Sequence, residues 1–138
     1  MQTGQVTAVS PGVVVLMIGT NNLGAGQSPT ATAEGIGRVV DGIKAVSPGT
    51  RILLLGVFPR GFSPADPVRG EIAQVNAEMA LLADGRRVVY RDIGGAFLSP
   101  DGSISPAVMA DGVHPTAYGY QLWTAAMWPT LAPMLAGQ

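Results

Sequence analysis

Val13-Val14-Val15-Leu16-Met17-Ile18 is an unbroken apolar run, rich in β-branched side chains, that ends at Gly19. A short run of this kind, bounded by a turn residue, is typical of a strand that is buried on both faces. Such strands occur in parallel sheets whose two faces are covered by helices. The run therefore favours an α/β fold built around a covered parallel sheet.

The rest of the chain continues this pattern, with helix-like and strand-like segments in alternation. The expected elements are a helix at 32–46 that begins at Thr32, a strand at 51–58, a helix at 66–85 that begins at Asp66 and Pro67, a strand at 88–93, and a last helix from about Thr116, with Pro129 kinking or ending its first part. Alternation of this kind indicates βαβ units with right-handed crossovers. The sequence thus predicts one α/β domain over residues 1–138.

Composition excludes several classes of function. The chain has 138 residues, 47% hydrophobic and 12% charged, with a net charge of −1, no cysteine and one histidine. No Lys/Arg cluster suggests a nucleic-acid surface, and no apolar run reaches the roughly 18 residues of a membrane span. Disulfides, thiolate metal sites and polyhistidine metal sites are excluded, and we expect no cofactor. Residues 1–5 lack the order of a signal peptide, so we expect a soluble, cytoplasmic domain unless a leader precedes it.

Ligands of a parallel α/β sheet gather beyond the carboxyl ends of the strands. The loops at 20–31, 59–65 and 94–115 should meet there. The first of them begins with Gly19-Thr20-Asn21-Asn22, whose asparagine amides could donate hydrogen bonds to an oxygen above the sheet edge. Asparagine and glycine are also ordinary turn residues, so this segment alone does not decide between a structural and a functional role.

The one histidine of the chain lies in Asp111-Gly112-Val113-His114-Pro115, directly before the last predicted helix. An aspartate three residues before a histidine can accept the Nδ1 proton and aim Nε2 outward, which orients a general base. The alternative is an ordinary helix-entry loop in which Asp111 caps a turn and His114 is merely exposed.

Together these motifs resemble two blocks of the SGNH (GDSL-type) ester hydrolase family. Gly19-Thr20-Asn21-Asn22 resembles the family's Gly-x-Asn-Asp block, with Asn22 where aspartate is usual, and Asp111–His114 resembles its Asp-x-x-His block. The match extends over nearly the entire chain and is most similar to one branch, the catalytic subunits of the intracellular platelet-activating-factor acetylhydrolase. Further matching stretches are Ile18–Asn22, Ile52–Gly61, Pro67–Arg69, Gln74–Asn76, Asp92–Phe97 and Asp101–Ser105.

The resemblance implies a flavodoxin-like, three-layer parallel sheet and a serine esterase acting on short acyl esters such as acetates. In that scheme Asp111 orients His114, His114 is the general base, and the Asn21 amide donates to the oxyanion. The family's Gly-Asp-Ser-(Leu/Ile) nucleophile block and the following glycine block are not in these 138 residues. We therefore expect a fold that lacks the first two βα units.

Without that block, the sequence does not identify the residue that acts as nucleophile. Ser28 and Ser63 follow the first two strands and are weak candidates, whereas Ser10 lies at the wrong end of its strand to meet His114. Three interpretations remain: an esterase using a surrogate serine, a partner's serine or an activated water; a truncated remnant; or a non-catalytic binding or oligomerisation module. A flavin or phosphate-receiver domain is disfavoured, since neither a Ser/Thr-rich phosphate loop nor an acidic cluster for Mg²⁺ is present.

The first strand also predicts assembly. Without the neighbouring strand of the family sheet, Val13–Ile18 becomes an edge that carries none of the charges, prolines or bulges that protect natural edges. We expect pairing through this edge strand, either with a second copy in a homo-oligomer or with a separate chain that supplies the missing units.

Overall fold

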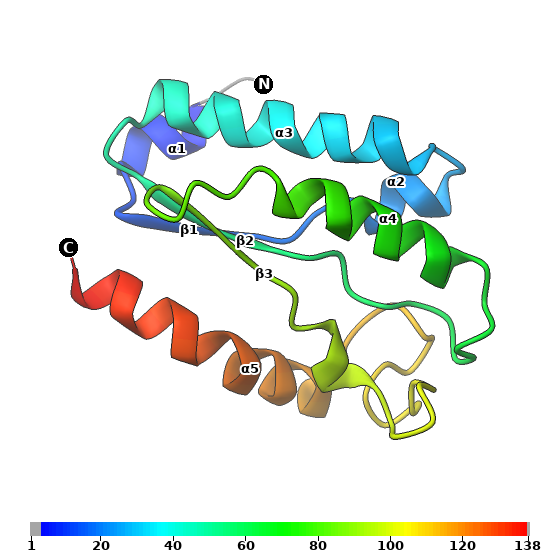
Figure 1. The fold of residues 1–138 in the computed structure, drawn as a ribbon. Coiled ribbons are helices and arrows are strands. Elements are labelled where there is room, and N and C mark those ends of the chain that lie inside the picture. Colours follow the sequence, from blue (N-terminus) through cyan, green and yellow to red (C-terminus); the bar gives the residue numbers. More distant parts are fainter. Residues whose placement is uncertain (1–3, 138) are drawn as a thin grey trace.

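Three parallel strands form the centre of the protein, for which a computed structural model describes residues 4–137 (Figure 1). They are β1 (Val13–Leu16), β2 (Arg51–Leu55) and β3 (Val88–Arg91), and they pair side by side in chain order. Val14 lies opposite Ile52, which in turn lies opposite Val88. The predicted parallel sheet is confirmed.

Helices cover the sheet on both sides and make a three-layer fold (Figure 1). The longest helices on one face are α3 and α4, which pack against each other, and α5 lies on the other face. None of the helices within residues 4–137 is both long enough and apolar enough to span a bilayer. The helical elements are α1 (Gly4–Val9), α2 (Thr20–Gly24), α3 (Pro29–Val46), α4 (Val68–Ala80), the 3-10 helix η1 (Gly94–Phe97) and α5 (Ala117–Ala136).

Strand β2 divides the core into two halves. Successive side chains of a strand point to opposite faces, so Ile52 and Leu54 pack towards α3 and α4 while Leu53 and Leu55 pack towards α5. All four are fully buried. This strand is buried on both faces, as its sequence predicts, because it has a strand on either side and helices above and below.

Strand β1 differs from the prediction that both of its faces are buried. Its residues are only partly buried, and Val15 is 38% exposed. The reason is its place in the sheet, since within residues 4–137 β1 pairs only with β2 and forms an edge. An apolar, β-branched run indicates a strand that can be buried. Whether it is buried depends on which other strands and helices pack against it, and the run itself does not show that.

Several predicted element boundaries are wrong. The loop expected at 20–31 contains α2 and the first turn of α3, and the helix cap is Ser28 rather than Thr32, because the Ser28 hydroxyl accepts the Ala31 N–H. All three strands end two or three residues early. Helix α5 continues through Pro129 to Ala136 instead of ending there. Helix α4 begins at Val68 with Pro67 at its N-cap position, one residue later than predicted, although Asp66 does accept the Val68 N–H.

Beyond the end of β2, the side chain of Asn76 takes over the backbone pairing. Asn76 comes from α4 and is buried, with 8% of its surface exposed. Its Oδ1 accepts the Val57 N–H at 2.7 Å, and its Nδ2 donates to the Val57 carbonyl at 3.0 Å. A buried backbone group without a partner is costly. Asn76 therefore allows the chain to leave the sheet at Val57 while that residue stays fully buried.

We predict that Asn76→Ala lowers the free energy of unfolding by about 2–3 kcal/mol, because it leaves the N–H and carbonyl of Val57 without partners. Urea denaturation followed by circular dichroism measures the loss. Gln74→Ala is the matched control, since Gln74 is exposed on the same helix and bonds only to Glu78. Equal stability of the two variants would contradict the role of Asn76.

Candidate active site

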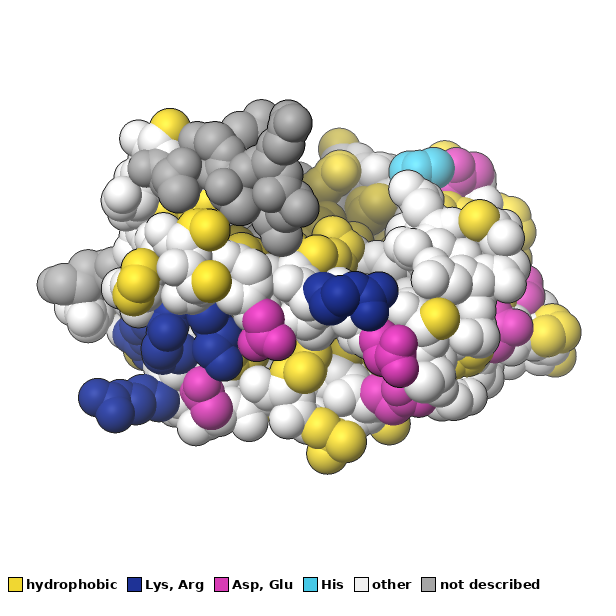
Figure 2. Space-filling view, turned by 90° about the horizontal axis from the view of Figure 1, so that it is seen from above, with side chains coloured by type: hydrophobic (Ala, Val, Ile, Leu, Met, Phe, Trp, Pro, Cys, Tyr) yellow, Lys and Arg dark blue, Asp and Glu magenta, His cyan; other side chains and the backbone are white. Residues whose placement is uncertain are grey.

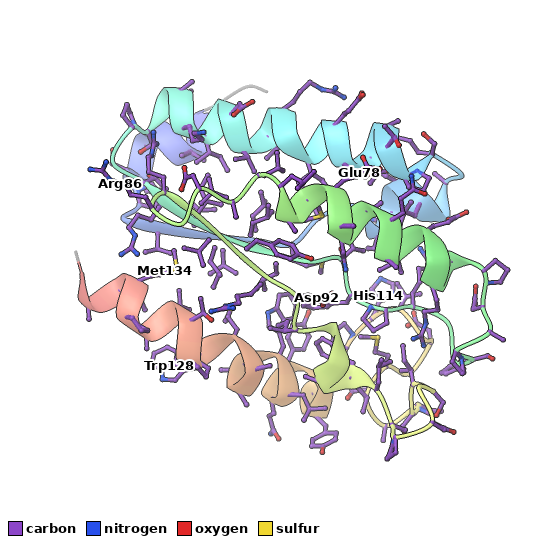
Figure 3. All side chains as sticks on the ribbon, viewed as in Figure 1. Glu78, Arg86, Asp92, His114, Trp128 and Met134 are labelled. Carbon is purple, nitrogen blue, oxygen red and sulfur yellow. The ribbon has the colours of Figure 1, made fainter. Side chains whose placement is uncertain are left out.

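A cleft of about 430 Å³ lies where the loop after β1 meets the loop before α5. In Figure 3, His114 lies at the end of the sheet opposite Arg86, and Arg86 precedes the amino end of β3. The cleft is therefore at the carboxyl edge of the strands, where the sequence places it. Its walls are Met17–Asn22, Val113, His114, Pro115, Tyr120 and Trp123.

The loop around Asp111 and His114 is organised by a single carboxylate. Asp111 Oδ2 is 2.6 Å from His114 Nδ1, and Oδ1 accepts the N–H groups of Val113 and His114 at 2.9 and 2.8 Å. The left-handed backbone of Gly112 (φ 74°) turns the chain so that all three donors reach the same side chain. The predicted contact between Asp111 and His114 is confirmed.

These hydrogen bonds also stabilise the ionised form of the Asp111 carboxyl. The backbone N–H of His114, then its side chain, then the N–H of Val113 hold the pKa of Asp111 well below its usual value of 3.8. An ionised carboxylate only accepts hydrogen bonds, so Nδ1 of His114 must carry the proton. In the neutral ring, Nε2 is then left with a free lone pair. The His114 side chain is 80% exposed, and Figure 2 shows the histidine at the surface beside an acidic side chain. The pair can accept a proton from a group in the cleft.

Residues 19–22, which we call the Asn21 loop, lead from the end of β1 through Gly19 into the first turn of α2, where Asn21 lies. Gly19 is buried, its φ is 117°, and a Cβ there would lie 3.1–3.3 Å from the side chains of α3 and of Val57. Asn21 is exposed, and no hydrogen bond engages its side-chain amide among residues 4–137. The neighbouring Asn22 instead donates to Gln27 Oε1 at 2.6 Å. As predicted, Asn21 and His114 line the same cleft, and the Asn21 amide is available to a ligand.

None of the candidate serines contacts the histidine. The hydroxyl groups of Ser28 and Ser63 accept backbone N–H groups at 3.3 and 3.1 Å, and Ser10 precedes the amino end of β1. In the described part of the chain, no serine hydroxyl forms a hydrogen bond with His114. The structure thus brings together Asp111, His114 and Asn21 but supplies no serine to them.

Two cleft residues escaped the sequence analysis. Tyr120 and Trp123 lie in the first two turns of α5, and their rings stack with centroids 5.6 Å apart. Trp123 also meets Phe58 edge-on at 4.7 Å, which fixes it against the core. Their spacing of three residues places them on one helix face, close behind His114 in the chain. This spacing is the feature of the sequence from which the two aromatic residues of the cleft could have been predicted.

A larger groove, of about 590 Å³, lies along α5 and includes Tyr120 and Trp128. Its lining contains no carboxylate, histidine or cationic side chain. Size alone does not identify an active site, and the smaller cleft holds the groups that can move protons. Within residues 4–137, no three acidic or histidine side chains gather as metal ligands do.

An aspartate-oriented histidine at the carboxyl edge of a covered parallel sheet is an arrangement found in many α/β hydrolases. Comparison with known proteins narrows this class. Residues 1–122 match the model of the GDSL-like lipase/acylhydrolase family, and the chain belongs to that family.

Relatives and solved structures agree with this assignment. The human platelet-activating factor acetylhydrolase IB subunit alpha1 is 32% identical over 99% of this chain, and the rat alpha2 subunit is 35% identical over 87%. The chain spans 58% and 52% of their respective lengths. A GDSL-like lipase from Bacteroides thetaiotaomicron superposes with a TM-score of 0.78, at 22% identity over 95% of this chain and 67% of the other. A carbohydrate esterase family 3 protein from Talaromyces cellulolyticus also gives 0.78, at 21% identity over 99% and 64%. The two structures establish likeness of fold.

The lowered pKa of Asp111 gives a pH prediction. Because the folded-state pKa is depressed, the carboxylate favours the ordered loop at pH values above its usual 3.8, and this contribution is lost as the pH falls towards the folded-state pKa. We predict that His114→Ala raises the pKa of Asp111 but leaves it below 3.8, since both backbone donors remain. Carbon-13 NMR titration of the carboxyl groups measures it. Asp101 serves as the control, because its pKa is lowered by hydrogen bonds from Ser103 and should not respond to the change at His114. Titration of Asp111 at its usual value in the variant would show that the backbone donors do not matter.

Proposed function

We propose that the chain contributes the acid–base pair and one oxyanion donor for the hydrolysis of short-chain, acetyl-type carboxylic esters. The observation that carries this is the 2.6 Å contact between Asp111 and His114 in the cleft that Asn21 also lines. In this scheme His114 Nε2 removes a proton from the nucleophile and later returns it to the leaving alcohol. Asp111 stays ionised and stabilises the imidazolium that forms in between.

Asn21 is the proposed oxyanion donor. When a nucleophile attacks an ester carbonyl, negative charge develops on the carbonyl oxygen, and a preorganised donor lowers the barrier. The Asn21 amide has no competing partner among the described residues, whereas that of Asn22 is occupied by Gln27. This difference supports Asn21, rather than Asn22, as the oxyanion donor.

The nucleophile is a serine supplied by another polypeptide segment or a water molecule activated by His114. The Oγ atoms of Ser28 and Ser63 are engaged with backbone amides and do not contact the histidine. An organophosphate that reacts covalently with active-site serines separates the two routes, since it inactivates the serine route and leaves the water route unchanged.

The substrate class rests on family membership and on the cleft. The relatives named above include platelet-activating factor acetylhydrolase subunits, and a structural neighbour is a carbohydrate esterase. An acetyl group is small, and the aromatic wall of Tyr120 and Trp123 offers an apolar surface to the other part of an ester. Short-chain p-nitrophenyl esters are therefore suitable probes.

We predict that His114→Ala lowers kcat/KM for p-nitrophenyl acetate by about 10²–10⁴-fold, because the general base is lost. Asn21→Ala lowers kcat by about 10²–10³-fold, because one oxyanion donor is lost. Release of p-nitrophenolate measures both. Asn22→Ala is the matched control, and its loss should be much smaller because the Asn22 amide is already bonded to Gln27.

Hydrolysis by the wild-type chain that survives His114→Ala would contradict the proposed mechanism. No hydrolysis by either protein would favour a second candidate function, a binding or oligomerisation module on the same scaffold. The uncovered edge of β1 is the observation that favours this alternative. Val15 is 38% exposed there, on a strand that has one neighbour among the described residues.

We propose that two copies of the chain pair through β1 and bury this edge. An exposed apolar edge strand with free backbone groups is a template for pairing with another strand. Helix α5 adds apolar surface, since Tyr120 and Trp128 are 55% and 53% exposed. In Figure 3, Trp128 lies on the side of α5 away from the sheet.

We predict that the wild-type chain is an oligomer at micromolar concentration and that Val15→Lys shifts it towards monomer, because a charge at the edge opposes pairing. Light scattering coupled to size exclusion measures the mass. Leu81→Lys is the matched control: Leu81 is 84% exposed, just beyond the end of α4, outside the edge strand. A compact wild-type monomer whose solubility Val15→Lys does not change would refute assembly through β1.

A further inference from the structure

The two motif loops of the candidate active site share an anchor, the Arg60–Gly61 segment that follows β2. Arg60 Nη1 donates to the Thr20 carbonyl, at the start of the Asn21 loop, at 2.9 Å. The Gly61 N–H donates to the Gly112 carbonyl, inside the His114 loop, also at 2.9 Å. Across the described residues, no hydrogen bond joins the two motif loops directly. Their relative position therefore depends on the segment between them.

This anchor is itself held by Arg69 of α4. Arg69 Nε donates to the Arg60 carbonyl at 2.7 Å, and its Nη2 donates to the Gly61 carbonyl at 2.9 Å. The planar guanidinium presents its donors in a fixed fork, so two consecutive carbonyls are held in one orientation. Both arginines are half-buried. The Arg60–Gly61 segment is thus hydrogen-bonded to α4 and to both motif loops.

Three glycines provide the room that these contacts need. A Cβ at Gly24 would lie 2.6 Å from Arg60 Nη1, so the guanidinium in its present position packs directly over this glycine. Gly61 and Gly112 both have left-handed backbones, with φ of 78° and 74°. A Cβ at Gly112 would lie 3.5 Å from Gly61 Cα, which shows how closely the two backbones approach.

We propose that Arg60 and Arg69 are positioning residues that set the Asn21 amide relative to His114 Nε2. The contact of His114 with Asp111 is internal to its own loop and does not need the arginines. What the arginines fix is the distance between the Asn21 amide, which donates to the carbonyl oxygen, and His114 Nε2, which accepts the proton of the nucleophile that attacks the same ester. The catalytic consequence rests on the proposed function, whereas the geometric role does not.

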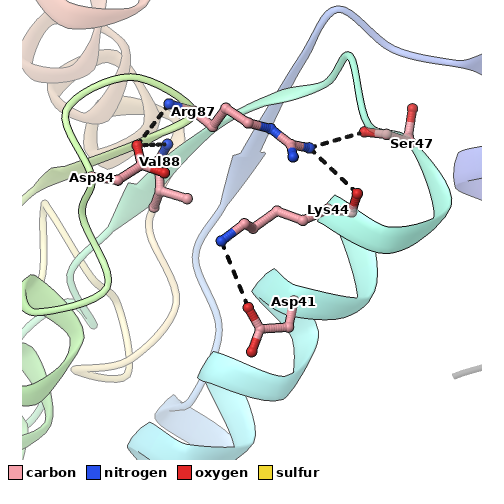
Figure 4. Close-up of polar contacts among 6 residues, drawn as sticks. All are labelled: Asp41, Lys44, Ser47, Asp84, Arg87 and Val88. Atoms are coloured by element: carbon pink, nitrogen blue, oxygen red, sulfur yellow. Dashed lines mark hydrogen bonds and ion pairs between the residues drawn. The ribbon is translucent and has the colours of Figure 1, made fainter.

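The test uses Arg60→Met and Arg69→Met, which keep a long side chain and remove the donors. Arg87→Met is the matched control, because Arg87 Nη2 also ties backbone carbonyls, those of Lys44 and Ser47 at 3.4 and 3.3 Å (Figure 4). Arg87 precedes β3 and lies at the amino edge of the sheet, far from the cleft. The readouts are backbone amide shifts and hydrogen exchange by NMR, together with kcat and KM for p-nitrophenyl acetate.

We expect Arg60→Met to displace the amide signals of residues 20–22, and Arg69→Met to speed exchange of the Gly61 amide about tenfold, the effect of losing a typical hydrogen bond. Both variants lower kcat with little change in KM, since the geometry of donor and base serves the transition state. Arg60→Lys keeps a donor and returns the signals of residues 20–22 towards the wild type. Arg87→Met leaves all of these unchanged.

Unchanged signals of residues 20–22 in Arg60→Met and of Gly61 in Arg69→Met overturn the proposal, whatever the activity. Displaced signals in a protein without esterase activity support the positioning role and contradict the proposed function instead. Where Arg69→Met does not fold, Arg69→Lys replaces it, because a lysine keeps the charge but cannot hold two carbonyls with a rigid fork.

Discussion

The parallel pairing of β2 with a strand on each side is the constraint on which the rest of the structure depends. It buries β2 completely, and it brings the carboxyl ends of three strands to one edge. Every loop that carries a candidate catalytic group leaves the sheet at that edge. The cleft follows from the strand direction, and the helices on the two faces hold that direction in place.

Where the backbone ladder ends, polar side chains replace it. Asn76 pairs with Val57 just beyond β2, Arg60 reaches the Thr20 carbonyl, and Asp111 collects the N–H groups before α5. Each of these contacts satisfies backbone groups that have left the sheet. The loops at the carboxyl edge of the sheet are therefore held by side-chain hydrogen bonds to their backbone, and this includes the loop that carries Asp111 and His114.

The sequence predicted what depends on local pattern. The apolar runs gave the parallel strands, and the three-residue spacing of Asp111 and His114 gave their contact, because both signals lie within a few residues. It did not predict α2, which is too short to show a helical period, or the exposure of Val15, which depends on a neighbouring strand. The contacts of Arg60 and Arg69 also escaped prediction, because they join the chain across a loop through long side chains whose direction no pattern encodes. The roles of Asp111, His114 and Asn21 in catalysis stay predictions.

The order of the strands in the sheet is the same as their order in the chain. Strands β2 and β3 therefore each pair with the strand that precedes them in the chain; α2 and α3 lie between β1 and β2, and α4 lies between β2 and β3. Among the strands of residues 4–137, none lies between two strands that precede it in the chain, and loop-closure entropy rises only slowly with the length of each crossover. The pairing of these three strands is therefore compatible with the order in which they are synthesised.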